Sequence, residues 1–475
     1  MLATRPFAIA ACTAYVLMLQ YSYRHIESVL YPEICLRYSP PPHYYEVAGY
    51  ALALLPALWI PVRLNRPSHL AYWILYLTVC APTMFIPFHV MSCPPDRILT
   101  LSATICGLFA LLAWIASGPP ISVRPPNLAP KDIIRGAIMV TGLLILLVGY
   151  VSGFKVNFSL ENVYDRRLEA REIVVGGGLT AYAMATLGSA VSPLLMAFGY
   201  VNKMPIALAC GIAGVLSLFS FAGTKHDLAA PVYLVGVLCL MQKREQSPGA
   251  IVGIAATFLI CLSVAHYFAT GDNTISVYFI RRSFFVPALL TSLYWDFFDG
   301  QSHIYYGDSF LRWLHASPYQ LPMARLIGEV YLHSAEANAN ANVWASGFGH
   351  AGFIGMTVST IVLGLLFRVI DGFARTVDLR VVSLMISLFA LSWSNGAIET
   401  SLLTYGVLPS ILLLHFLGSD REESDLRSGS VNKANGSQNY SSTETSRTTG
   451  CLPMRKPVSL VLNSRQTTAV AGGSN

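Results

Sequence analysis

Apolar stretches of about 16 to 22 residues recur along most of the chain, separated by short segments with proline, glycine or charged residues. At 1.5 Å per residue, each stretch is long enough or nearly long enough to cross a hydrocarbon core about 30 Å thick. Charged residues make up only 12% of the 475 residues, against about 25% in an ordinary soluble domain. The sequence therefore predicts an all-α polytopic membrane protein and excludes a soluble enzyme.

Hydropathy predicts about twelve transmembrane helices when proline, glycine and charge are used as boundaries. The predicted spans lie near residues 7–30, 47–62, 70–91, 98–117, 133–153, 173–199, 205–222, 229–241, 249–268, 349–368, 381–395 and 401–417. With a cytoplasmic N-terminus, the inside loops hold most of the basic pairs, such as Arg63 and Arg66, as the positive-inside rule requires. The shortness of 229–241 leaves counts of eleven or thirteen open.

The chain divides into a membrane domain, residues 1–417, and a polar C-terminal segment, residues 418–475. The C-terminal segment is rich in Ser, Thr, Asn and Gly and has almost no large apolar residues, so it is predicted to be a disordered cytoplasmic tail. Residues 269–348 separate two predicted spans and contain many aromatic residues, which indicates a large folded loop at the outer, periplasmic face. Basic residues sit mostly in short loops, so nucleic acid is not a predicted partner.

Cysteine and histidine spacing predicts neither a metal nor a cofactor. The nine cysteines are scattered, and no pair or cluster has the spacing of metal ligands. Cys35 and Cys93 fall in the first two predicted outer loops, where an oxidising compartment would allow a disulfide between them. Spacing along the chain does not decide whether they pair.

Basic residues in predicted outer loops break the positive-inside rule and are candidates for anion binding. Arg166, Arg167 and Arg171 lie between the fifth and sixth spans. Arg167 and Arg171 are one helical turn apart, so on a helix they would share a face and could hold one anionic group. The alternative is a solvated surface helix on which neighbouring carboxylates neutralise them.

Two further basic sites lie at the predicted outer face. Arg281 and Arg282 are adjacent, and side chains of adjacent helical residues point about 100° apart, so one would face a site and the other solvent or lipid headgroups. Lys225 lies in a glycine turn between the seventh and eighth spans and could meet a phosphate. For both sites the alternative is an anchor at the membrane interface.

Polar residues in the large predicted loop are candidates for sugar binding and proton transfer. Asn338, Asn340 and Asn342 alternate along the chain, and amides are well suited to sugar hydroxyls. Asp296 is one of several carboxylates there, and His303 is one of several histidines that can move protons near neutral pH. Spacing singles out none of them as a general base. Close helix packing is indicated by the glycines that follow, Gly347, Gly349, Gly352 and Gly355.

Taken together, these segments resemble bacterial oligosaccharide repeat-unit polymerases of the O-antigen polymerase (Wzy) type, over roughly residues 160–415. The resemblance rests on the arginine-bearing loop before GGGLTAYAMATLGSAVSPLLMAFG, the turn AGTKHDL, the run RRSFFVPALLTSLYWDFF and the block ANANANVWASGFGHAGFIG. The chain departs from the family pattern in two places. It has Gly223-Thr-Lys-His226 where the family turn would be Gly-Ser-Lys-Ser, and Ser346 where an aspartate is common.

The resemblance implies a GT-C-like fold and a metal-independent glycosyltransferase of the bacterial inner membrane, with its active site facing the periplasm. Such an enzyme polymerises undecaprenyl-diphosphate-linked oligosaccharide repeat units into O-antigen, capsule or exopolysaccharide. Its further partners, beyond the lipid bilayer, would be flippase and chain-length regulator proteins. The O-antigen ligase shares this plan and donor. A twelve-span organic-anion transporter or flippase is a third reading, but mid-span charge and matched broken helices are not evident in the sequence.

The expected chemistry assigns roles to the candidate residues. Breaking a sugar–phosphate bond leaves a negatively charged diphosphate, which arginine or lysine stabilises without a metal. We therefore expect four arginines to be catalytic, namely Arg167, Arg171, Arg281 and Arg282. We expect six residues to contact the substrates, namely Arg166, Lys225, Asp296, Asn338, Asn340 and Asn342.

Overall fold

The computed structural model describes residues 3–126, 128–154, 156, 178–223, 225–241, 248–309, 312–313, 315–334 and 336–418. Over these residues the protein is helical and contains no β-strand. Six helical segments are long and apolar enough to cross a membrane. They are Pro67–Val90, Pro95–Ser117, Pro130–Val151, Thr180–Val201, Ala250–Thr270 and Val343–Phe373. The chain is thus a helical protein of membrane character, while the count of about twelve spans stays a prediction.

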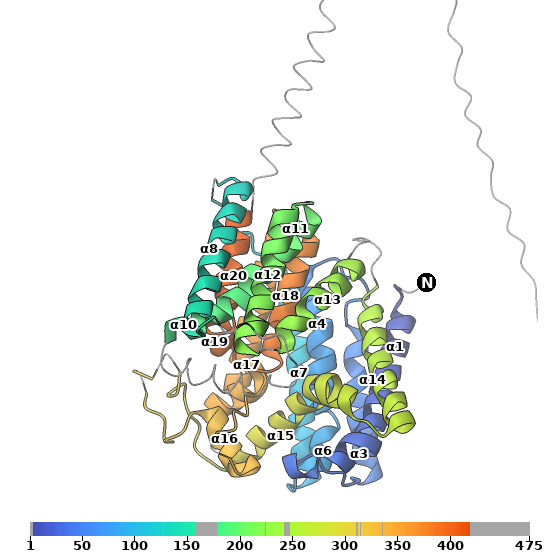
Figure 1. Cartoon of the computed structure of the whole chain (residues 1–475). Coiled ribbons are helices and arrows are strands. Elements are labelled where there is room, and N and C mark those ends of the chain that lie inside the picture. Colours follow the sequence, from blue (N-terminus) through green and yellow to red (C-terminus); the bar gives the residue numbers. More distant parts are fainter. Residues whose placement is uncertain are drawn as a thin grey trace, which may run out of the picture. The chain divides into compact units, whose positions relative to one another are not determined.

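The N-terminal half consists of helices joined by short π-helical and 3₁₀ segments (Figure 1). They are α1 (Arg5–Ser22), η1 (Tyr23–Glu27), α2 (Ser28–Leu30), η2 (Pro32–Ile34), α3 (His43–Leu54), η3 (Leu55–Leu58), α4 (Pro67–Leu75), η4 (Tyr76–Cys80), α5 (Ala81–Thr83), α6 (Ile86–Val90), α7 (Pro95–Ser117), α8 (Pro130–Val151), α10 (Gly178–Thr186), η5 (Leu187–Val191), α11 (Ser192–Val201) and α12 (Pro205–Ala222).

The C-terminal half continues in the same way. It contains α13 (Lys225–Leu240), α14 (Ala250–Thr270), η6 (Ser276–Phe285), α15 (Val286–Phe298), α16 (Met323–Leu332), α17 (Val343–Phe373), α18 (Leu379–Trp393), α19 (Ile398–Leu403) and α20 (Val407–Leu417). Every predicted span overlaps one of these helices. Four further apolar segments are shorter than these six, namely Pro205–Phe221, Ala230–Leu240, Leu379–Trp393 and Val407–Leu417.

Proline starts many of these helices. Pro67, Pro95, Pro130 and Pro205 each occupy the first turn of an apolar helix. Proline is favoured there because the first amides of a helix have no partner within it and because the fixed φ of proline matches the helical value. The prolines used as boundaries of predicted spans therefore lie at the starts of helices.

The interior is organised around the segment Pro67–Val90. The apolar part of this segment is 94% buried, so the segment lies inside the protein and not at its lipid-facing surface. Helix α4 packs against α18, α7 against α17, α1 against α14, and α11 against α12. The indole rings of Trp73, Trp344 and Trp393 are fully buried in this core. Large aromatic rings fill the space between helices that small side chains leave empty.

The predicted large loop, residues 269–348, is mostly helical. Helix η6 continues directly into α15, whose residues from Pro287 to Trp295 are buried. Helix α15 packs against α17 and α6. A surface loop would leave these apolar residues in water, so burial explains why the segment enters the helical body. The membrane side on which it lies stays a prediction.

Cys35 and Cys93 are both free cysteines in the structure. The Cys35 thiol donates a hydrogen bond to the carbonyl oxygen of Tyr331 at 3.5 Å. The disulfide that the sequence left open is therefore not formed.

Candidate functional site

Helix α17 is interrupted at Ala351 and Gly352. Gly352 has φ 58° and ψ −142°, a conformation that residues with a Cβ atom rarely adopt. The amides of Ile304 and Tyr305 donate hydrogen bonds to the carbonyl oxygens of Gly349 and His350 at 3.0 and 2.9 Å. A broken helix in an apolar environment needs such partners for its backbone groups. The segment around Ile304 is thereby held against the break.

His350, which is buried, and Glu399, which is only partly buried, form a pair at this break. His350 is only 1% exposed, and its Nε2 lies 2.9 Å from Oε1 of Glu399 in α19. With Glu399 ionised, Nε2 carries the proton and donates it, while Nδ1 presents a lone pair. Nδ1 is buried and has no hydrogen-bond partner in the structure. A carboxylate that orients a histidine in this way is the arrangement that general-base catalysis uses.

Tyr306 covers the imidazole ring of His350. The two rings are stacked, with centroids 4.1 Å apart and planes 17° from parallel. Burial raises the pKa of the Tyr306 phenol, and the nearby charge of Glu399 raises it further. Tyr305 and Tyr306 both have positive φ, 50° and 61°. Consecutive non-glycine residues in this region store backbone strain, which is concentrated at functional sites.

A cationic and polar group lies next to α19. Tyr405 lies in the turn between α19 and α20, and the positive charge of Arg282 acts on its phenol. Asn340 donates a hydrogen bond from Nδ2 to the Tyr405 hydroxyl at 3.3 Å. Glu399 and Tyr405 belong to the same short stretch of chain. The predicted residues Arg282 and Asn340 therefore both act on Tyr405, which follows Glu399 in the chain.

Arg281 takes a different direction from Arg282. Its guanidinium carbon lies 4.1 Å from the ring centroid of Tyr31. Its charge also acts on Glu27, which is fully buried and accepts a hydrogen bond from the hydroxyl of Ser276. Arg281 thus joins η6 to the segment that follows α1, whereas Arg282 is exposed and near Tyr405. The two adjacent arginines have separate surroundings.

The predicted sugar-binding amides and Asp296 differ in their availability. Asn342 is fully buried and caps α17, because its Oδ1 accepts from the amides of Trp344 and Ala345. Its Nδ2 donates to Thr291 at 2.6 Å, so its side chain is engaged within the protein. Asn338 and Asn340 are exposed. Asp296 is exposed and accepts a hydrogen bond from the Tyr331 hydroxyl at 2.7 Å.

Four predicted basic residues are not placed by the structure. Arg166, Arg167 and Arg171 lie outside the described residues. Lys225 is the first residue of α13, but its side chain is outside the description. Their roles stay predictions.

His350, Glu399 and Tyr306 were missed by reasoning from the sequence. A signal was present, since His350 lies between glycines at the start of a predicted span and Glu399 is a lone carboxylate in an apolar region. Ionisable residues in such segments are functional-site candidates by default. Among the described residues no group of three or more His, Cys, Asp or Glu side chains is placed to hold a metal ion.

The site is therefore a pair of buried His350 and partly buried Glu399 at a helix break, with Tyr306 stacked on the histidine. Asn340 bonds to Tyr405, on which the charge of Arg282 acts. Comparison with protein-family models, with curated proteins and with solved structures found no match for this chain.

Proposed function

We propose that this chain is a membrane glycosyltransferase that polymerises lipid-diphosphate-linked oligosaccharide repeat units. The observation that carries the proposal is the pair formed by buried His350 and partly buried Glu399 at the break in α17. The charge of Arg282 acts on Tyr405, which follows Glu399 in the chain. A general base and a cation are the two groups that metal-independent transfer of a sugar from a diphosphate requires. The resemblance of residues 160–415 to oligosaccharide polymerases supplies the substrate class.

His350 is the proposed general base. Once Tyr306 has moved off the imidazole ring, the otherwise buried Nδ1 accepts the proton of the acceptor hydroxyl, and the hydroxyl oxygen attacks the anomeric carbon of the donor sugar. The bond between that carbon and the phosphate oxygen breaks, and the diphosphate leaves with the electron pair. Glu399 stabilises the imidazolium that forms and keeps the proton on Nε2 before reaction, as a carboxylate partner does in other histidine bases.

Arg282 is the proposed contact for the leaving diphosphate. Arg282 is exposed on η6, and its positive charge acts on the phenol of Tyr405 in the turn after α19. Arginine forms planar, bidentate hydrogen bonds with phosphate oxygens, and a fixed cation near a developing anion lowers the barrier. The predicted contribution of Arg166, Arg167 and Arg171 would add to the same function.

Exposed aromatic rings and amides supply surfaces for the sugar chains. Trp313 and Tyr305 are 75% and 53% exposed. Asn338 and Asn340 are exposed amides on the segment that leads into α17. Aromatic faces pack against the apolar faces of sugars, and amides bond to their hydroxyls.

A second candidate is a proton-coupled transporter of an organic anion. The observation that favours it is the break in α17 beside a buried histidine and carboxylate, since transporters use broken helices and ionisable pairs near their binding sites. The two functions make opposite predictions about whether a glycosidic bond forms.

The test is polymerisation by purified protein in liposomes, with the lipid-linked repeat unit as the sole substrate and gel analysis of the products. His350→Gln should lower the rate by about 10²- to 10⁴-fold, the usual contribution of a general base. His43→Gln is the matched control, because the His43 side chain is fully exposed. An unchanged ladder from His350→Gln at wild-type abundance would overturn the assignment. Uptake of the repeat unit without linkage would favour the transporter.

A further inference from the structure

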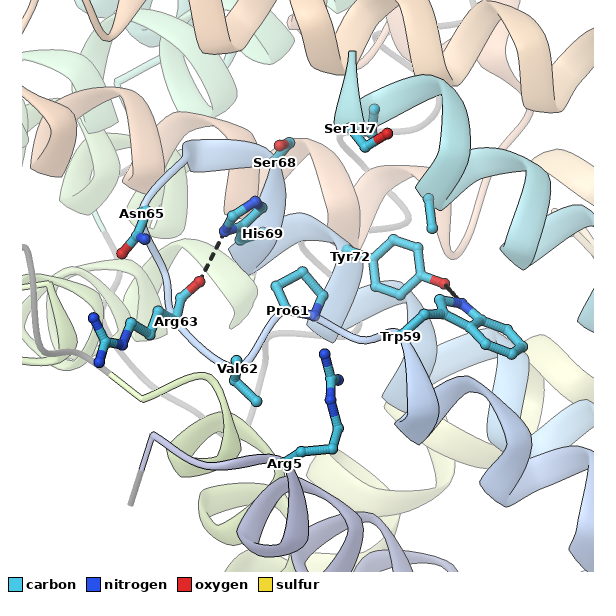
Figure 2. Close-up of a pocket in the computed structure, with 12 residues that line it drawn as sticks. Arg5, Trp59, Pro61, Val62, Arg63, Asn65, Ser68, His69, Tyr72 and Ser117 are labelled. Carbon is cyan, nitrogen blue, oxygen red and sulfur yellow. Dashed lines mark hydrogen bonds between the residues drawn. The ribbon is translucent and has the colours of Figure 1, made fainter. Parts of the chain in front are cut away.

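A pocket of about 340 Å³ lies at the start of α4 and the end of α7 (Figure 2). Its volume is at the small end of the range of about 300–1,000 Å³ for ligand pockets. The lining includes Arg5, Trp59, Arg63, His69 and Ser117. Pro67–Val90 begins here and Pro95–Ser117 ends here, and both are long enough to cross a membrane. The pocket therefore lies at the depth where a span meets lipid headgroups.

The pocket is far from the His350–Glu399 pair. Asp371, near the end of α17, bonds to Ser68 of the pocket wall, whereas His350 lies near the start of α17. At 1.5 Å per residue these two positions on α17 are about 30 Å apart. The pocket and the proposed catalytic pair thus lie at opposite ends of a helix that is long enough to span the membrane.

The charge of the pocket is positive. Its 12 lining residues include two arginines and no aspartate or glutamate. Next to it, Arg66 donates hydrogen bonds to the carbonyl oxygens of Ala116 and Gly118 at 3.2 and 2.9 Å. The nearby Asp371 is only 3% exposed, and both its oxygens accept hydrogen bonds from Ser68. Arg5 and Arg63 therefore line the pocket, and none of its described lining residues is a carboxylate.

The wall of the pocket is built before any ligand binds. Trp59 donates from Nε1 to the Tyr72 hydroxyl at 2.8 Å, and this hydroxyl donates to the carbonyl oxygen of Phe109 at 2.9 Å. His69 donates from Nδ1 to the carbonyl oxygen of Arg63 at 2.8 Å, as Figure 2 shows. These polar groups are satisfied within the protein. A preorganised wall reduces the entropy lost on binding.

The two arginines differ in how much donor capacity they keep. Arg5 uses Nη1 for the carbonyl oxygens of Ala57 and Ile60, and the rest of its five N–H groups remain. In Figure 2 the Arg5 side chain rises between Val62 and Trp59. Arg63 is exposed at the rim. In Figure 2 the Arg63 guanidinium points away from Arg5, so the two arginines offer their donors at different edges of the pocket. The planar donors of arginine suit the oxygens of a tetrahedral phosphate.

We propose that this pocket binds a phosphate group, either the phosphodiester of an anionic lipid headgroup or a soluble phosphate. The ligand class follows from the two arginines in the lining, the lack of a carboxylate among the described lining residues and the position at the end of two spans. The proposal is independent of the glycosyltransferase proposal, because it concerns the opposite end of α17.

Native mass spectrometry of the delipidated full-length protein in neutral detergent tests the proposal. The probes are dioleoyl phosphatidylglycerol, dioleoylglycerol, which lacks the phosphate, and inorganic phosphate as a competitor. We expect phosphatidylglycerol to bind more tightly than dioleoylglycerol. Arg63→Gln should weaken this binding by about tenfold, the effect of about 1.4 kcal/mol. Ser117→Glu, which places a carboxylate in the wall, should weaken it as well.

Arg135→Gln is the matched control, because Arg135 is an exposed arginine that pairs with Asp132 on α8, outside the pocket. Retention of phosphatidylglycerol in the presence of inorganic phosphate identifies the lipid as the ligand. Direct binding and competition by inorganic phosphate identify the soluble source. Equal binding of phosphatidylglycerol and dioleoylglycerol, with no binding of inorganic phosphate, would overturn the proposal. So would equal affinities of Arg63→Gln, Ser117→Glu and Arg135→Gln.

Discussion

Asp371, at the end of α17, caps the first turn of α4 although the two partners are 303 residues apart in sequence. Its Oδ1 accepts a hydrogen bond from the backbone amide of Ser68 at 2.9 Å, and its Oδ2 accepts one from the Ser68 hydroxyl at 2.6 Å. The first amides of a helix have no partner inside it, so an acceptor from another helix stabilises its start. One side chain thus joins the beginning of the central segment to the end of the longest helix.

Asp371→Ala is expected to destabilise the protein by about 1–3 kcal/mol, because two buried polar groups of Ser68 lose their partner. Thermal unfolding of the purified protein in detergent measures the change. Asp132→Ala is the control, because Asp132 is 63% exposed and pairs only with a nearby exposed arginine. Equal melting temperatures for the two variants would show that the cap contributes nothing.

Glu399→Gln is expected to reduce polymerisation strongly while the fold is kept. Glutamine can still accept the hydrogen bond from His350, but it lacks the charge that stabilises the imidazolium. The double variant with His350→Gln should be about as slow as the slower single variant, since residues that act as one unit are not additive. Rates in the liposome assay measure this. Additive losses would indicate two independent contributions.

Gly352→Ala is expected to lower both stability and activity. A Cβ at Gly352 would meet Nε2 of His303 at 3.1 Å, and the positive φ of 58° is strained for alanine. The strain would move the break and with it His350. Gly107→Ala in α7 is the control, because a Cβ there meets nothing within 4 Å. Wild-type melting temperature and rate for Gly352→Ala would contradict the need for this conformation.

The helices could be predicted from the sequence because membrane spans are long apolar runs with clear boundaries. The small-residue pattern also indicated close packing, and a Cβ at Gly347 or Gly349 would meet neighbouring atoms at 2.8 or 2.3 Å. The same pattern hid the break at Gly352, since spacing along the chain does not reveal φ. The sequence thus predicted the elements and not their irregularities.

The candidate site was predicted only in part. The predicted residues Arg282 and Asn340 both act on Tyr405, but the His350–Glu399 pair joins residues 49 apart on two helices. No local spacing rule connects them. Asn342 illustrates the opposite error, because an amide beside an apolar span also serves as a helix cap. Whether such an amide binds a ligand or caps a helix depends on contacts that exist only in the folded chain.

The two faces of the membrane can be distinguished by labelling single cysteines in a cysteine-free background. Ser302 and Asn65 are both exposed, and they precede α17 and α4 respectively. With both chain ends in the cytoplasm, Ser302→Cys should react with an impermeant maleimide in intact cells and Asn65→Cys only after lysis. The reverse pattern would invert the topology and place the proposed catalytic pair on the cytoplasmic side.

Arg281→Gln and Arg282→Gln should have different effects although the residues are adjacent. Arg282→Gln should slow polymerisation by about 100- to 1000-fold at normal abundance, because a contact to the leaving diphosphate is lost. Arg282→Lys keeps the charge without the planar fork and should restore only part of the rate. Arg281→Gln should mainly lower abundance and melting temperature, because Arg281 stacks on Tyr31 and its charge acts on the buried side chain of Glu27.

The measurements for this pair are the liposome rate and the melting temperature of each variant, taken from the same preparation. Arg97→Gln is the control, because Arg97 is an exposed arginine whose partner Asp299 lies at the end of α15. A normal rate for Arg282→Gln at wild-type abundance would remove Arg282 from the leaving-group site and leave Arg167 and Arg171 as the candidates. A large rate loss for Arg281→Gln at an unchanged melting temperature would place Arg281 in contact with the substrate after all, since a structural contact alone changes stability before it changes chemistry.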